Sequence, residues 1–204
     1  MIEEWIQKTH LESKEALKKT FLSAVPFPHL QMEDFFIEGK VEEIYGALLE
    51  GEFIEKRSDL FQFKQTNDLI STSNKTLEEF YIFLSSNEFR NFMQDITGLS
   101  LKEGANNVAG TLYEDTDYLL IHDDQLDQRK IAYLLYLADL DEKTGGSLEL
   151  YSSNEDGSPK EVATKLYPRA NGFTFFEVSK ISYHAVEEVI DAQRLAIGGW
   201  LHGQ

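Results

Sequence analysis

The sequence predicts an α+β fold that is mainly β: a double-stranded β-helix, or cupin-like jelly roll, with N-terminal supporting helices. Three observations predict it. Apolar residues in the first hundred positions recur at helical spacing. From about residue 106 onward, short strand-like runs alternate with turn sequences. Fourteen Phe and nine Tyr, with only four Pro, favour a β-rich interior.

The chain has 204 residues, which suits one domain. No Pro-, Gly- or Ser-rich linker separates the helical part from the strand-rich part. We therefore expect a single domain over residues 1–204. Helical support would occupy about residues 1–100, and the jelly-roll core about residues 105–204.

Three segments, residues 2–22, 38–50 and 76–97, have the apolar spacing of helices. Pro26 and Pro28 end the first helix, and the chain continues as a strand-like entry. In the third segment the apolar residues recur at three- and four-residue steps, which predicts a core face rather than a ligand site. Its stripe consists of Leu77, Phe80, Tyr81, Leu84, Phe89, Phe92, Met93 and Ile96.

Residues 59–75 are polar and aromatic, and two interpretations of them stay open: a lid or substrate-binding loop, and a plain surface loop. After this segment, β-rich runs bounded by turn sequences predict a series of strands. The predicted strands lie at 106–115, 117–122, 130–139, 146–153, 172–179, 185–190 and 194–203. Gly145–Gly146 belongs to a turn, because no phosphate-binding Lys and helix follow it.

Composition narrows the class of partner and compartment. The formal net charge of −17 argues against direct nucleic-acid binding through phosphate contacts. It suits a basic protein partner, although solubility alone also explains an acidic surface. No Cys is present, which excludes disulfides and thiolate chemistry and fits a reducing compartment. No apolar run is long enough to span a membrane, and the first residues lack a signal-peptide core. We expect no membrane partner and a cytoplasmic or nuclear location.

The segment LLIHDDQLDQRK, residues 119–130, places one histidine beside two acids. Strand side chains alternate between faces, so His122 and Asp124 would point the same way and Asp123 the opposite way. A His-x-Asp pair at a strand end can supply two ligands to a metal ion. On its own this spacing is a weak signal, because such pairs arise often by chance.

A second group of residues adds weight to the first. His184 lies 62 residues after His122, and Arg194 follows ten residues later inside an apolar strand. On that strand face the small residues Ala196 and Gly198 leave room for a ligand beside the guanidinium. Arg suits a carboxylate bidentately, but a salt bridge to a core acid is an open alternative.

Two histidines and one carboxylate form the facial triad of non-haem Fe(II) oxygenases, which leaves open positions on the metal. A small dicarboxylate could chelate the metal at one end and meet Arg194 at the other. His122, Asp124 and His184 are therefore the candidate metal ligands and catalytic residues. His10, His29 and His202 are expected to lie outside the site.

The sequence resembles a known family, the Fe(II)- and 2-oxoglutarate-dependent prolyl hydroxylases. It is most similar to the eukaryotic-type enzymes that hydroxylate a proline of a small-subunit ribosomal protein at the decoding centre. The resemblance covers roughly residues 20–203. It is carried, in order, by VPFPHLQMEDFF, DLFQFKQTNDL, LLIHDDQLDQRKIAYLLYL, GGSLELYS, FFEVSKISYHAVEEV and RLAIGGWLHG.

The resemblance implies roles for single residues. His122, Asp124 and His184 would hold Fe(II), and Arg194 would bind the distal carboxylate of 2-oxoglutarate. Tyr113 and Tyr136 would line the co-substrate pocket. O2 would be the second co-substrate, ascorbate a supporting reductant, and the substrate a basic ribosomal protein.

Two departures from the family pattern stand out. Eukaryotic members usually carry a second, non-catalytic barrel, whereas this sequence ends at LHGQ; a single-domain member and a truncated one are both open. Ala196 stands where a small hydroxyl residue often sits, so one hydrogen bond to the co-substrate is expected to be missing. Trp200 matches a position near the pocket, with core packing as an equal alternative.

Other functions and several details also stay open. The same chemistry could act on another protein or on a small molecule, or the barrel could be a catalytically idle binding domain. The oligomeric state and the choice of C3 or C4 hydroxylation are not predicted.

Overall fold

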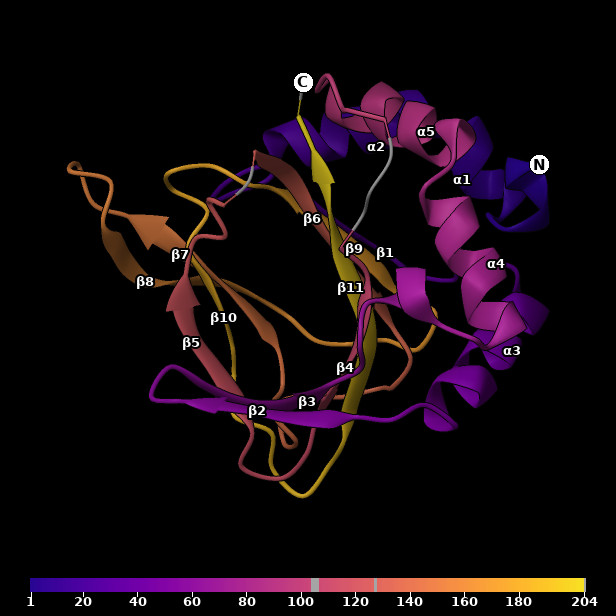
Figure 1. Ribbon diagram of the computed structural model, residues 1–204. Coiled ribbons are helices and arrows are strands. Elements are labelled where there is room, and N and C mark those ends of the chain that lie inside the picture. The colour runs from indigo at the N-terminus through magenta and orange to yellow at the C-terminus, as the bar shows by residue number, and fades with distance from the viewer. Residues whose placement is uncertain (104–106, 127, 204) are drawn as a thin grey trace.

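A computed structural model of the protein describes residues 1–103, 107–126 and 128–203. Within these residues one antiparallel sheet of eleven strands curves into a nearly closed barrel (Figure 1). Its order is β1-β9-β6-β11-β4-β3-β5-β10-β7-β8, and β2 pairs with β3. The strands are β1 (His29–Met32), β2 (Ile54–Ser58), β3 (Phe61–Gln65), β4 (Ala109–Tyr113), β5 (Tyr118–His122), β6 (Arg129–Tyr136), β7 (Leu148–Ser153), β8 (Pro159–Leu166), β9 (Phe173–Glu177), β10 (His184–Val186) and β11 (Arg194–His202). The predicted fold class is confirmed.

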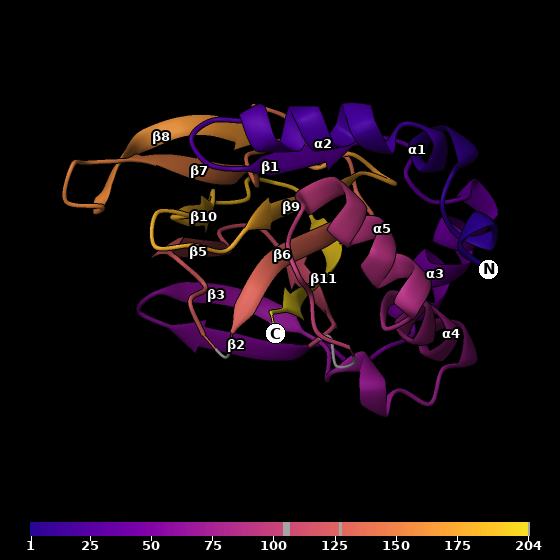
Figure 2. The same cartoon turned by 90° about the horizontal axis from the view of Figure 1, so that it is seen from above.

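The helices gather on one side of this sheet (Figures 1 and 2). They are η1 (Ile2–Glu4), α1 (Lys8–Glu12), α2 (Lys14–Ser23), α3 (Glu38–Leu49), η2 (Leu69–Ser71), α4 (Lys75–Leu84) and α5 (Asn87–Thr97). None of these described helices is both long enough and apolar enough to cross a bilayer.

The prediction of one helix over 76–97 is wrong in one respect, because the segment forms two helices. Asn74 caps α4, its side chain accepting from the Thr76 amide at 3.0 Å. The helix stops at Ser85, and the Ser86 side chain accepts from the Phe89 amide at 3.2 Å to start α5. Gly98, with φ of 74°, ends α5. The segment 2–22 is likewise divided into η1, α1 and α2.

The main hydrophobic core lies between the helices and one face of the sheet. Its centre is Phe173 on β9, whose ring stacks on Phe35 with centroids 4.5 Å apart and contacts Phe36 edge-on. Phe80 of α4 and Phe89 of α5 are fully buried in the same cluster. The aromatic stripe predicted as core is therefore confirmed as core.

Strand alternation gives the sheet two different faces. On β6, Tyr133 and Leu135 belong to the core under the helices. Ala132 and Leu134 face the barrel interior, where they line a cavity. The helices thus cover one face of the sheet, while the other face is available for a site.

Strands β2, β3 and β8 were not predicted. Residues 59–75 are not a single loop, because Phe61–Gln65 forms β3 between β4 and β5 in the barrel wall. The alternation of Phe61 and Phe63 with the polar residues Gln62 and Lys64 was the available signal for a strand. The edge strand β8 is mostly exposed, so its sequence carries little apolar pattern. Asn106, the start of one predicted strand, lies outside the described residues.

Candidate active site

A β-bulge in β5 aims His122 into the barrel. Across the β5–β10 pair, His122 lies opposite His184 and Leu119 lies opposite Val186. The chain therefore takes three residue steps on β5 (119 to 122) for two on β10 (184 to 186). One extra residue switches the alternation, so Leu119 and His122 both line the cavity. Leu120 and Ile121 are left 48% and 43% exposed.

Asp124 reaches the site through a turn rather than along a strand. Strand β5 ends at His122, and Asp124 has a left-handed φ of 58°. The predicted extended geometry is wrong at this residue, although the residue that it selected does face the histidines. Asp has a short polar side chain and tolerates this conformation better than most residues. Asp123 instead accepts bonds from the Gln125 backbone and side chain at 3.2 and 2.9 Å.

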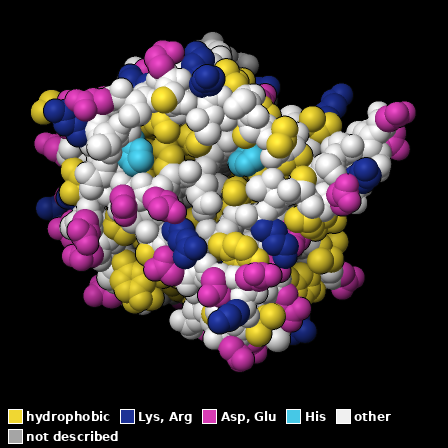
Figure 3. Space-filling view, turned by 180° about the vertical axis from the view of Figure 1, so that it is seen from behind, with side chains coloured by type: hydrophobic (Ala, Val, Ile, Leu, Met, Phe, Trp, Pro, Cys, Tyr) yellow, Lys and Arg dark blue, Asp and Glu magenta, His cyan; other side chains and the backbone are white. Residues whose placement is uncertain are grey.

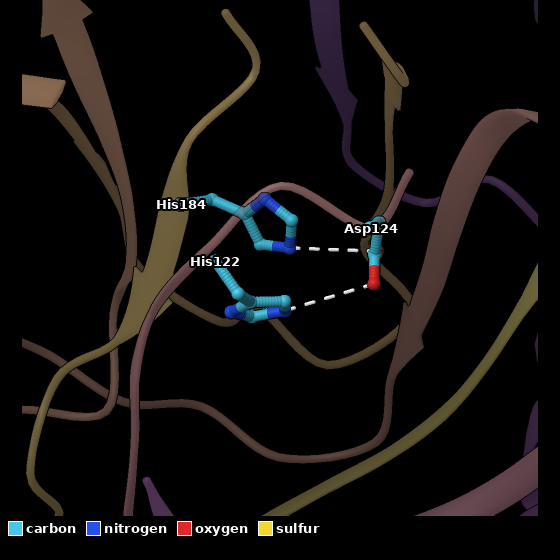
Figure 4. Close-up of side chains that lie close together, drawn as sticks. All are labelled: His122, Asp124 and His184. Carbon is cyan, nitrogen blue, oxygen red and sulfur yellow. Dashed lines mark ion pairs between the residues drawn. The ribbon is translucent and has the colours of Figure 1, made fainter. Parts of the chain in front are cut away.

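His122, Asp124 and His184 converge on one point (Figure 4). The Asp124 carboxylate lies 3.7 Å from Nε2 of His122 and 3.5 Å from Nε2 of His184. One possible ligand atom from each residue lies within 4.8 Å of the others. The three side chains come from β5, from the turn that follows it and from β10, so tertiary structure assembles them.

Backbone carbonyls orient both imidazole rings. Nδ1 of His122 lies 2.9 Å from the Leu120 carbonyl oxygen, and Nδ1 of His184 lies 2.9 Å from that of Ser182. Each Nδ1–H donates to its carbonyl, which leaves the Nε2 lone pairs facing the carboxylate. Two lone pairs and an anion that face one another repel unless a cation lies between them. This donor set fits a divalent metal ion.

The charge states agree with that arrangement. Burial and, to a smaller extent, the neighbouring His184 together lower the pKa of His122 to about 4. Burial opposes ionisation of Asp124, but the interactions of its carboxylate with His184, His122 and Trp200 outweigh burial and lower the pKa of Asp124 to about 2. At neutral pH the site therefore holds a neutral His122 and an ionised Asp124.

The lowered pKa of His122 predicts acid sensitivity of the metal-free protein. Between about pH 6.5 and pH 4 the unfolded chain protonates His122 but the folded chain does not. The free energy of unfolding should therefore fall as the pH falls through this window. With allowance for solvent screening, the loss in the free energy of unfolding that is due to His122 should be on the order of 1–3 kcal/mol. Urea unfolding in a chelator at several pH values would measure this. His122→Gln should flatten the pH dependence; an unchanged slope would contradict the assignment.

Arg194 is buried at the start of β11, deep in the barrel, and is 1% exposed. Its Nε donates to the Gly146 carbonyl at 2.9 Å, and Nη2 donates to the Tyr136 hydroxyl at 3.3 Å. The guanidinium carbon lies 5.1 and 5.0 Å from the ring centres of Tyr113 and Tyr136. Among the described residues no Asp or Glu oxygen pairs with it within 4.0 Å, so the alternative of a core salt bridge is not realised there. The cation is poised for an external anion.

A cavity of about 140 Å³ joins these groups. His122, Asp124, His184, Arg194 and Tyr113 all line it. Tyr136 is not among its lining residues; it lies behind Arg194 and holds the guanidinium, which differs from the expected role at the pocket wall. Burial raises the pKa of Tyr113 and of Tyr136, so both hydroxyls stay protonated and can donate.

Some residues of the site were not predicted from the sequence. Thr111 lines the cavity directly opposite Ala196, and its hydroxyl donates to the Ala196 carbonyl at 3.4 Å. The hydroxyl that Ala196 on β11 lacks is thus matched by the Thr111 hydroxyl on the neighbouring strand β4. Arg129 was not predicted either; it stacks on Trp200, which lines the cavity and was expected either near the pocket or in the core. His10, His29 and His202 do not line it, as expected.

A second hollow is larger but lacks this chemistry. It has a volume of about 520 Å³ and lies beside the end of α3 and the segment 66–74. None of the six predicted site residues lines it. The smaller cavity is therefore the candidate active site, because it contains the convergent donors.

The turn that carries the Arg194 acceptor depends on Gly146. Its φ is 71°, and a Cβ there would lie 2.5 Å from Cδ2 of Leu140. Gly157 also has a positive φ, 85°, but open space around it. Both Gly→Ala changes should cost about 1–2 kcal/mol of stability from backbone strain, and Gly146→Ala should cost more because of the clash. Chemical unfolding of the two variants would measure the difference; equal losses would contradict it.

Comparison with known proteins agrees with this geometry. Residues 108–202 match the 2OG-Fe(II) oxygenase superfamily. Prolyl 3-hydroxylase OGFOD1 of Xenopus laevis is 38% identical over 186 residues, which is 89% of this chain and 36% of that protein. Prolyl 3-hydroxylase OGFOD1 of Mus musculus is 36% identical over 186 residues, which is 90% of this chain and 33% of that protein. The chain thus spans about a third of the length of these curated relatives.

Solved structures share the fold. A Pseudomonas putida prolyl-4-hydroxylase superposes with a TM-score of 0.70 at 16% identity, covering 92% of this chain and 99% of the other. A Trichoplax adhaerens prolyl hydroxylase, solved with a peptide fragment of hypoxia inducible factor, gives a TM-score of 0.73 at 16% identity. That match covers 96% of this chain and 93% of the other.

Proposed function

We propose that this chain, whose residues 108–202 match the 2OG-Fe(II) oxygenase superfamily, hydroxylates a prolyl residue of a protein, using Fe(II), 2-oxoglutarate and O2. One observation supports the proposal most strongly: His122, Asp124 and His184 converge in the same cavity as the buried Arg194, which has no Asp or Glu ion-pair partner among the described residues. The named prolyl 3-hydroxylase relatives support the choice of a prolyl substrate.

The residues present fit Fe(II). Two imidazole nitrogens and one carboxylate oxygen are the donors of the facial triad, and they leave open positions for other ligands. His122, Asp124 and His184 would hold the metal. Bound Fe(II) would supply the oxidising chemistry, with O2 as oxidant and 2-oxoglutarate as the co-substrate that is converted to succinate and CO2.

The protein's own groups would bind and orient the co-substrate. The remaining N–H donors of Arg194 suit the distal carboxylate of 2-oxoglutarate, because a guanidinium can donate two parallel bonds to it. The protonated Tyr113 hydroxyl is a further donor at the cavity wall. Leu134, Leu148 and Phe176 add apolar walls that limit water around the reacting groups.

We further propose a basic substrate, with a small-subunit ribosomal protein as the first candidate. The formal net charge of −17 would attract such a partner. Figure 3 shows acidic side chains spread over one face of the molecule, with apolar side chains exposed between them. A cytoplasmic or nuclear location would fit this substrate, and ascorbate would support activity by keeping the iron reduced.

The direct test is incubation with the candidate ribosomal protein, Fe(II), 2-oxoglutarate and O2, followed by mass spectrometry. The proposal expects a gain of one oxygen on a prolyl residue and equal formation of succinate, both absent with His184→Ala. Succinate without a modified ribosomal protein would favour another protein or a small molecule as substrate. No succinate with any prolyl protein would favour the idle binding domain.

A further inference from the structure

Two side chains outside the metal triad hold the Asp124 carboxylate. The Trp200 indole Nε1–H donates to Oδ2 at 2.9 Å. Nη1 of Arg129 lies 3.4 Å from Oδ1. The Arg129 guanidinium also stacks on the Trp200 ring, its carbon 3.6 Å from the ring centre. Carboxylate, indole and guanidinium therefore form a closed set of contacts, which we call the Asp124 clamp.

Asp124 needs such support more than the two histidines do. His122 and His184 lie opposite each other on paired strands, and a backbone carbonyl fixes each ring. Asp124 lies beyond the end of β5, in a left-handed conformation, so no strand pairing sets its orientation. Its carboxylate would rotate about the Cβ–Cγ bond without the contacts to Trp200 and Arg129.

The position of Arg129 is hard to explain without Asp124. Its side chain is only 15% exposed, and its Nε is buried with no hydrogen-bond partner among the described residues. A buried cation is costly unless it meets an anion or an aromatic face. The stacking on Trp200 and the ion pair with Asp124 supply both. Oδ1 of Asp124 thus has the Arg129 guanidinium at 3.4 Å as well as Nε2 of His122 at 3.7 Å.

We propose that Trp200 and Arg129 are positioning residues that fix the rotation of the Asp124 carboxylate, so that it offers a single oxygen to the metal. This inference rests on the proposed metal site. A carboxylate that turns freely can bind a cation through both oxygens, as flexible carboxylates do. The second oxygen would take a coordination position that the co-substrate or O2 needs.

The test uses Co(II), without 2-oxoglutarate, as a spectroscopic substitute for Fe(II). Trp200→Phe keeps the aromatic ring under Arg129 but removes the N–H donor. Arg129→Leu removes the charge, and Arg129→Lys keeps it without the planar stack. Trp5→Phe is the matched control, because Trp5 packs on Phe80 and Phe83 in the helical core.

We expect Trp200→Phe and Arg129→Leu to weaken Co(II) binding by about 10- to 100-fold, the usual effect of losing an outer partner of a metal ligand. Their visible d–d absorption should also shift as the second carboxylate oxygen becomes a ligand, whereas loss of packing alone would not change it. Arg129→Lys should fall between these variants and the wild type, and Trp5→Phe should match the wild type.

Two results would overturn the inference, and they are distinguishable. If the wild type binds Co(II) and the clamp variants keep its affinity and spectrum, the clamp is wrong and the metal site stands. If the wild type binds no Co(II), the proposed metal site fails as well. Should Trp200→Phe not fold, the two Arg129 variants decide the question.

Discussion

Replacing Asp124 with alanine is expected to abolish metal-dependent turnover, whereas replacing Asp123 should leave it nearly unchanged. Asp124 supplies the only carboxylate among the converging triad, and it faces Nε2 of both histidines. Its loss should lower metal affinity by more than the roughly 10- to 100-fold that follows loss of an outer partner. Succinate formation and calorimetric metal titration would measure the two effects.

Asp123 is a matched control because it is the neighbouring residue with the same side chain. It bonds to Gln125, and among the described residues the two histidines form their ion pairs with Asp124 rather than with Asp123. Metal binding that survives Asp124→Ala but is lost in Asp123→Ala would mean that the turn after β5 adopts another geometry, and the site would be wrong.

The second large effect is expected at Arg194. Arg194→Gln should raise the KM for 2-oxoglutarate by on the order of 100-fold or more, because truncating one partner of a buried charged pair costs about 2–5 kcal/mol. Arg194→Lys should recover part of the loss, since it keeps the charge but not the two parallel donors. Steady-state kinetics with varied 2-oxoglutarate would measure both.

Because Arg194 is also bonded to Gly146 and Tyr136, its variants need a folding control. Metal affinity without 2-oxoglutarate should stay close to the wild-type value if the barrel is intact. An unchanged KM in a folded Arg194→Gln variant would show that another group binds the co-substrate.

Strand alternation predicted that Asp124, and not Asp123, lies on the same side as His122. Asp124 does lie there, but the cause is not an extended strand. The β5 bulge reverses the alternation before His122, and the left-handed turn brings Asp124 back to the same side. Neither feature has a local signature in LLIHDD. Bulges and left-handed residues depend on pairing with β10, which lies more than 60 positions away in the chain.

In other parts of the fold, too, local sequence patterns predicted what depends on burial and missed what depends on single side chains or distant segments. Strong apolar periodicity predicted the core stripe of α4 and α5, because burial selects those side chains directly. The break at Ser85–Ser86 follows from a single side-chain cap, which periodicity does not detect. Arg129 could not be assigned from sequence, because its meaning comes from Trp200 and Asp124 on other segments.

Anaerobic titration of the protein with Fe(II) and 2-oxoglutarate tests the central claim most directly. If His122, Asp124 and His184 hold the metal beside Arg194, the visible charge-transfer band of a 2-oxoglutarate chelate should develop at one equivalent of Fe(II). It should be absent in Asp124→Ala. A folded wild-type protein that gives no band, or a band that persists unchanged in Asp124→Ala, would contradict the site.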